Sequence, residues 1–190
     1  ELEAETTIYA KWTVGSANYT IIYWQQKSTD KMDAADADKT YDYYSAVVRS
    51  DTAGTKVSIT TDDTTMGGTT SSTMGYYFTY NSTNSDVDEV NLAADGSTVL
   101  NVYYDRRTVT INFYDQTSTA TYNNYYNSNL HTSLTGLYGA PIDGTTLAWP
   151  SPDSGYAWAY RVSSSGAPST LTTAYTTMEF PDEWVDNGYN

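Results

Sequence analysis

Short alternations of hydrophobic and polar residues recur along the chain, and each of them predicts a β-strand. The clearest covers 108–114, TVTINFY, where Val109, Ile111 and Phe113 share one face of an extended segment. The run at 19–25, YTIIYWQ, is apolar on both faces, which predicts a strand at the centre of a sheet. Other alternations predict strands at 40–48, 57–59, 76–80, 98–104, 120–126, 135–142, 156–162 and 176–180.

Polar and glycine-containing stretches separate these runs. The segment 30–38, DKMDAADAD, carries Asp where a helix interior disfavours it, so it predicts a loop with at most one helical turn. The stretch 61–73 predicts a surface loop, and no window has the length and 3.6-residue period of a strong helix. The pattern therefore predicts a mainly β (α+β) chain, with turns at 51–54, 94–96, 143–144, 150–155 and 163–168.

The order of the strands indicates more than one unit. The short strand IYAKW at 8–12 has no hairpin partner before it, so we expect 1–17 to be the tail and linker of a preceding repeat. The pattern restarts at Arg106, which predicts one unit at 18–106 and a second at 107–190 with almost no linker. Two β units joined strand to strand are expected to form a stiff rod.

Composition agrees with a β-rich, exported protein. The chain has 20 Tyr and 5 Trp against 3 Phe, and aromatic residues favour strands. Its net charge of −14 repels nucleic-acid phosphates and anionic membrane surfaces. The absence of cysteine excludes disulfides and thiolate metal sites, and no apolar run is long enough to span a bilayer. There is no signal peptide, which we expect of a fragment from the interior of a longer chain.

Several of these stretches resemble a known family of bacterial surface repeats. The strand IYAKW resembles the end of the Listeria–Bacteroides repeat, also called the internalin B-repeat, in which the next repeat opens with a strand like 19–23. The unit 18–106 resembles the related mucin-binding-protein-type repeats through YTIIYW (19–24), GTKV (54–57), GYYFTYNSTNS (75–85) and ADGSTVLNVYYDR (94–106). The unit 107–190 is similar through VTINFYD (109–115), YGAPI (138–142) and GYAWAY (155–160), but MEFPDEW (178–184) replaces the closing LYAKW-like strand.

The resemblance implies both a fold and a setting. Each unit is expected to be a ubiquitin-like β-grasp, a small mixed sheet that usually has one short helix, so that two tandem modules follow the last strand of an upstream repeat. The family implies an extracellular position on a bacterial cell surface, in a parent protein anchored to the cell wall. Neighbouring repeats of the same chain and host glycans, mucin or surface proteins are the expected partners.

Candidate catalytic and metal-binding residues give little support to an enzyme. His131 is the only histidine and has no nucleophile motif beside it, so we interpret it as structural. One histidine without cysteine also excludes an ordinary zinc centre, and the acidic run 86–89 lacks the glycine that a calcium loop needs. We therefore expect no catalytic residue, cofactor or metal, with incidental calcium as the alternative. The acidic loops, which hold Asp33, Asp36, Asp38, Asp62, Asp63, Asp86, Asp88, Glu89, Asp182, Glu183 and Asp186, are expected to be solvated.

Aromatic residues are the better candidates for a binding surface. Adjacent Tyr-Tyr pairs on a strand point to opposite faces, so one of each pair is expected in the core and one on the surface. An exposed row of rings could stack against sugars or peptides, and its candidate residues are Trp24, Tyr44, Tyr77 and Tyr103. We favour the alternative that these rings simply cover the sheet.

A further alternative is an intramolecular amide between a lysine and an Asn or Asp. It requires a buried lysine beside the acceptor and an adjacent acid, and the candidates are Lys11, Lys27, Lys31, Lys39 and Lys56. We favour solvated lysines. The sequence thus predicts a non-catalytic stalk or weak binding repeat of a cell-surface adhesin, and a dedicated glycan- or mucin-binding module is the competing hypothesis.

Overall fold

The fold is known from a computed structural model, which describes residues 9–10, 13–65, 77–115, 129–155, 159–160, 169–170 and 176–179. The described residues are mainly β, as predicted, and their only named helices are two short 3-10 turns, η1 (Asp36–Asp38) and η2 (Thr61–Thr65). The strands are β1 (Ser16–Gln26), β2 (Tyr41–Thr52), β3 (Lys56–Val57), β4 (Phe78–Asn81), β5 (Val90–Asn91), β6 (Val99–Arg106), β7 (Thr108–Asp115), β8 (Asn129–Leu137), β9 (Ala159–Tyr160) and β10 (Ser169–Thr170).

Four strands form the main sheet, in the order β2-β1-β6-β4. β1 is antiparallel to β2 and parallel to β6, with Thr20 opposite Val99 and Gln25 opposite Tyr104. β4 is antiparallel to β6 at the other edge. The prediction of a central strand at 19–25 is therefore confirmed. β2 continues four residues beyond the predicted end at 48, because its whole length pairs with β1.

The inner face of the main sheet carries the core. Alternation buries one face of β1 as far as Tyr23 and one face of β6. Side chains from β3, from β4 and the residue before it, and from the residue after β5 complete the core. Ile21 is completely buried, and burial of such a side chain stabilises a fold by about 1.5–3 kcal/mol. The buried residues are Ala17, Tyr19, Ile21, Tyr23, Val57, Tyr77, Phe78, Leu92, Leu100, Val102 and Tyr104.

β7 and β8 form a second, antiparallel sheet. Val109, Ile111 and Phe113 face a separate small core, which confirms the alternation predicted for 108–114. This core also contains Leu134, Leu137, Ala140, Ile142 and Met178.

Four of the strands predicted in the second half differ from the structure or lie wholly or partly outside the described residues. The strand predicted at 135–142 instead occupies 129–137, because the chain turns at Gly139, whose φ of 75° ends the extended run. Of 176–180, the described residues form only an isolated bridge between Thr177 and Pro141. The strand predicted at 120–126 lies outside the described residues, and that at 156–162 is described only at β9.

The N-terminal expectations have a mixed outcome. Of the strand expected at 8–12, only Tyr9 and Ala10 are described, and neither lies in a strand. β1 begins at Ser16, inside the stretch expected to be a linker. The loop predicted at 30–38 is confirmed, with η1 as its one helical turn.

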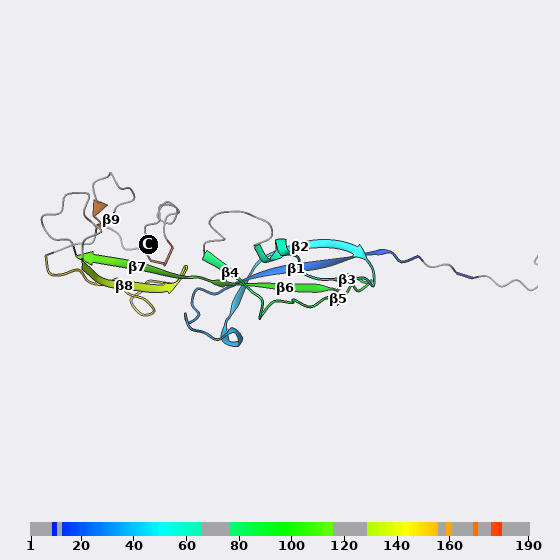
Figure 1. The fold of residues 1–190 in the computed structure, drawn as a ribbon, viewed down its shortest axis with the longest axis horizontal. Coiled ribbons are helices and arrows are strands. Elements are labelled where there is room, and N and C mark those ends of the chain that lie inside the picture. The colour runs from blue at the N-terminus through cyan, green and yellow to red at the C-terminus, as the bar shows by residue number, and fades with distance from the viewer. Residues whose placement is uncertain are drawn as a thin grey trace, which may run out of the picture.

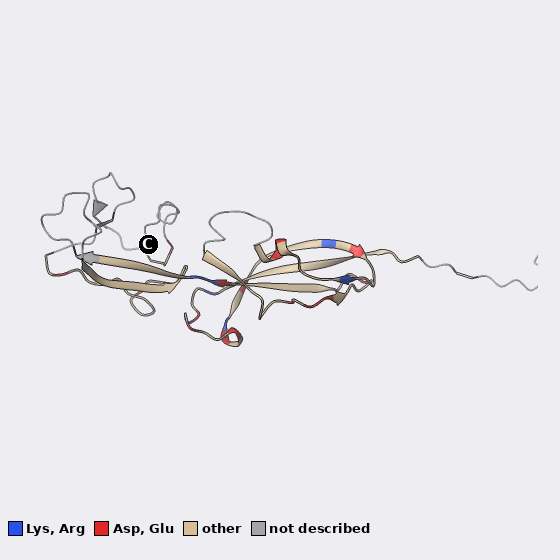
Figure 2. Cartoon of the chain, viewed as in Figure 1, with Lys and Arg blue, Asp and Glu red and all other residues tan. Residues whose placement is uncertain are grey.

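A single residue, Arg107, separates β6 from β7. The second sheet therefore continues lengthwise from the main sheet, and the two lie end to end along the long axis of the molecule (Figure 1). The residues that lead into β1 leave the main sheet at the end opposite to β7. The end of β6 and the residue before β7 are charged, with Asp105 followed by two arginines. Figure 2 shows acidic and basic colour where the two sheets meet.

Candidate functional site

Four rings form an aromatic strip across the outer face of the main sheet. The strip consists of Tyr41 and Tyr43 from β2, Trp24 from β1 and Tyr103 from β6. The Trp24 ring stacks on Tyr103 with centroids 6.1 Å apart and meets Tyr43 edge-on at 6.2 Å. Tyr41 packs edge-on against Tyr103 at 4.6 Å, and Trp24 Nε1 donates to Asn101 Oδ1 at 2.9 Å. These contacts hold the four rings against one another.

The sequence predicted part of this strip. Trp24 and Tyr103 come together as candidates, and the pair 103–104 divides between the faces as expected, with Tyr104 in the core. Tyr44 is the extra residue of a β-bulge, because Tyr23 pairs with Ser45 while Trp24 pairs with Tyr43. The bulge leaves both Tyr43 and Tyr44 exposed, so the expectation that one of them is buried was wrong.

Tyr77 does not belong to an exposed platform. Its side chain is only 5% exposed, and its ring stacks on Tyr138 with centroids 3.8 Å apart and planes 10° from parallel. Its place just before β4 puts it between the main sheet and the turn after β8. The prediction of Tyr77 as a surface ligand-binding residue is corrected by this burial.

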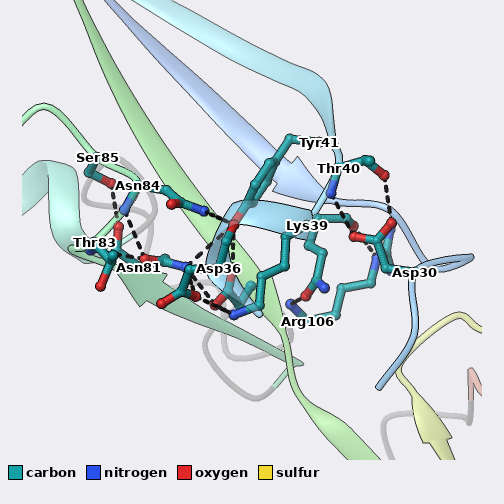
Figure 3. A network of polar contacts seen from close by, with 12 residues as sticks. Asp30, Asp36, Lys39, Thr40, Tyr41, Asn81, Thr83, Asn84, Ser85 and Arg106 are labelled. Carbon is teal, nitrogen blue, oxygen red and sulfur yellow. Dashed lines mark hydrogen bonds and ion pairs between the residues drawn. The ribbon is translucent and has the colours of Figure 1, made fainter. Parts of the chain in front are cut away.

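Beside the aromatic strip lies a polar network centred on Lys39, shown in Figure 3. Lys39 Nζ lies 2.6 Å from Asp36 Oδ1 and 2.7 Å from Asp105 Oδ2. Asn81 Nδ2 donates to the same two oxygens at 3.0 and 2.9 Å. The Tyr41 hydroxyl donates to Asp105 Oδ1 at 2.8 Å, so one residue belongs to both the strip and the network. The network ties η1 and the start of β2 to β4 and β6.

Electrostatics within this network favour the charged forms. Burial on its own would lower the pKa of Lys39, but the hydrogen bonds that its ammonium donates to Asp105 and Asp36 outweigh it and raise that pKa above its usual value. The hydrogen bond from Lys39 lowers the pKa of Asp36. The Lys39 side chain is only 17% exposed, so the expectation of solvated lysines is wrong at this position, whereas the Asp36 side chain is 39% exposed and keeps contact with solvent.

Asp63 is the charged residue that the sequence reasoning missed. It was expected in a solvated acidic loop, but its side chain in η2 is completely buried. Its carboxylate accepts two hydrogen bonds from the Arg49 guanidinium, at 2.6 and 2.8 Å, and one from the Tyr23 hydroxyl at 2.5 Å. The Thr60 amide and hydroxyl donate to it as well, and the Tyr104 hydroxyl donates to its carbonyl oxygen. The sequence gives little indication that Asp63 is buried, beyond its position in the first turn of a short helix.

The junction between the two sheets is held from both sides. The Arg107 amide donates to the Tyr77 carbonyl at 2.8 Å, and the Tyr138 amide donates to the Arg107 carbonyl at 2.9 Å. The Arg106 guanidinium donates to the Tyr138 carbonyl at 2.9 Å and lies 5.0 Å from the centroid of the Phe78 ring. Burial lowers the pKa of Arg106, but its ordinary value is so high that it stays a cation.

Arg106 also joins β6 to the end of β1. Its amide donates to Gln26 Oε1 at 3.0 Å, and its Nε donates to the Gln26 carbonyl at 2.5 Å. Gln26 is itself buried, so these bonds are shielded from water. Arg106 thus bonds both to the end of β1 and to the turn after β8.

Catalytic and metal-binding features are sparse in the part of the chain that is described. His131 lies half-buried on β8, and no cluster of three or more His, Cys, Asp or Glu side chains suited to a metal ion occurs among the described residues. Among the same residues there is no helix of the length and apolar character needed to cross a membrane. Comparison with protein-family models, with curated proteins and with solved structures found no match for the chain.

Proposed function

We propose that this chain is a non-catalytic repeat region of a bacterial cell-surface adhesin, which acts as a stalk that projects a more distal part of the parent protein. The observation that carries the proposal is the junction at Arg107, where one sheet passes into the next with a single residue between strands. A linker of one residue, hydrogen-bonded to both sides, cannot behave as the flexible coil that separates independently moving domains.

The fold assigned to each unit in this proposal is a β-grasp-like module. In the first unit, a small mixed sheet with a parallel pair at its centre and antiparallel strands outside supports it. In the second unit, the support is limited to the β7–β8 pair and its own buried cluster, which shares the partly buried Val109 with the first core.

Small-angle X-ray scattering tests the stalk. We expect the chain to scatter as an extended particle, and a variant with a Gly-Ser linker inserted after Arg107 to show a broader distribution of dimensions. Identical scattering from both proteins would mean that the junction is already flexible, and the stalk proposal would fail. Antibody labelling of intact cells that express the parent protein tests the surface position separately.

A second function, binding of sugar rings, is supported by the aromatic strip. Tyr43 is 61% exposed, and the stacked pair of Trp24 and Tyr103 is held in place beside it. Flat aromatic surfaces with hydroxyl groups nearby suit stacking against sugars. On a glycan array, binding that is lost in Trp24→Ala and kept in Tyr9→Ala, an exposed ring outside the strip, would favour this function. No binding across mucin-type glycans would remove it.

A further inference from the structure

The parallel pair of β1 and β6 lies where a pulling force along the molecule would act. β1 is entered at Ser16, at one end of the main sheet, and β6 leaves it after Arg106, at the opposite end (Figure 1). The two strands are neighbours in register from Thr20 opposite Val99 to Gln25 opposite Tyr104. We propose that this pair is a force-bearing clamp, which resists stretching of the chain by its two ends.

The direction of the load gives the clamp its strength. Tension draws β1 by its N-terminal end and β6 by its C-terminal end, so it slides two parallel strands past each other. Their hydrogen bonds run across the strands, so sliding loads all of them together, whereas peeling the strands apart breaks them one at a time. The bond from the Thr20 amide to the Thr98 carbonyl, 3.0 Å long, is the first of this ladder.

Side chains strengthen the clamp on both faces of the sheet. On the outer face Trp24 lies opposite Tyr103 in the register, stacks on it, and donates to Asn101 on the same neighbouring strand. On the inner face, Ile21 and Leu100 are registered partners and both are buried. Sliding by one residue would invert the faces of one strand relative to the other, so these contacts must break before the strands move.

The far end of the clamp is closed by Arg106. Its two hydrogen bonds to Gln26 join the last residue of β6 to the last residue of β1, where the load from β7 enters the main sheet. The backbone continues from β6 into β7, so tension reaches this point without first unfolding a linker. The need for such resistance rests on the proposed stalk function, but the resistance itself is a property of the isolated protein.

Single-molecule pulling in two directions tests the clamp. The chain contains no cysteine, so introduced cysteines give unique attachment points. Val14→Cys with Thr108→Cys pulls β1 and β6 in shear, and Val14→Cys with Ser97→Cys pulls the same two strands apart from one end. All three positions are exposed, and circular dichroism establishes that both variants fold before pulling.

We expect the unfolding force in the shear direction to be several-fold higher than in the peeling direction at the same pulling speed. Equal forces, or a higher force on peeling, would overturn the clamp. That result would leave the stalk proposal standing, because scattering measures the extended shape without load. Scattering that indicates a flexible junction, combined with a high unfolding force in shear, would support the clamp and contradict the stalk.

Discussion

Replacing Asp63 with alanine removes the acceptor at the centre of a buried polar cluster. The carboxylate accepts from the Arg49 guanidinium, from the Tyr23 hydroxyl and from both the amide and the hydroxyl of Thr60. These partners come from β1, from β2 and from the segment just before η2, so the substitution removes the side-chain bonds between η2 and the main sheet, while the bond from the Tyr104 hydroxyl to the backbone carbonyl at position 63 remains.

The expected loss of stability follows from the burial of each partner. Removing one member of a buried ion pair typically costs about 3–5 kcal/mol. The Arg49 side chain is 28% exposed and can turn towards water, which places this case near the lower end. The Tyr23 hydroxyl cannot do so, and a buried donor left without its acceptor costs about 1–3 kcal/mol. We therefore expect Asp63→Ala to lower the free energy of unfolding by about 3 kcal/mol, against a total of about 5–15 kcal/mol for a typical domain.

Urea denaturation followed by circular dichroism measures this loss. Asp62→Ala is the matched control, since it removes the neighbouring exposed carboxylate from the same turn. A difference of less than about 0.5 kcal/mol between the two variants would refute the reasoning, because that is the ordinary range for surface substitutions.

The pH dependence of the same difference gives a second check. Burial would raise the pKa of Asp63, but the hydrogen bonds from Arg49, Tyr23 and Thr60 outweigh it and hold that pKa below its usual value. The native state then binds fewer protons than the unfolded state at acid pH, so the stabilisation is complete above the unfolded pKa, about 4. This stabilisation is lost as the pH falls through the pKa that Asp63 has in the folded protein. The gap in stability between the native protein and Asp63→Ala should therefore shrink below about pH 4.

Two further predictions concern the junction and the lysine network. Gly139→Ala should destabilise the second sheet more than Gly144→Ala in thermal unfolding. Both glycines have positive φ, so alanine at either position adds about 1–2 kcal/mol of backbone strain. At Gly139 the added Cβ would also lie 2.8 Å from Arg106 Nη1, whereas at Gly144 it would meet no atom within 4 Å. Equal effects would mean that the guanidinium moves aside freely. Lys39 should form no amide with its neighbours, because a protonated ammonium beside Asp105 has no lone pair for attack. Intact mass should equal that of the sequence, and a mass lower by one ammonia or one water would contradict this.

Local alternation predicted those parts of the fold in which one face of a strand is buried. The pattern of Val109, Ile111 and Phe113 gave the correct faces of β7, and the apolar character of both faces of 19–25 gave the correct central position of β1. Period-two patterns identify such strands because burial of alternate side chains is itself the cause of the pattern. Alternation did not predict the end of the edge strand β2. Ser50 and Thr52 pair with β1 there, but their side chains are exposed and leave no hydrophobic pattern.

The parts that could not be predicted depend on contacts between distant residues. Asp63 resembles its exposed neighbour Asp62 in sequence, and only Arg49 and Tyr23, brought near by the sheet, make its burial favourable. Tyr77 was misassigned because its burial depends on Tyr138, which lies in the turn after β8 and is distant in sequence. Sequence identified Trp24 and Tyr103 as surface aromatics, but their stacking required the register of the parallel strands.

The length of the molecule depends on the passage of β6 into β7. Two eight-residue strands on either side of Arg107 make a nearly continuous extended segment, about 55 Å long at ~3.3 Å per residue. Loops leave this axis sideways, so insertions and deletions in them would alter the girth of the molecule and leave its span unchanged. The distance between the two ends of this segment is therefore set by its strands and not by the loops.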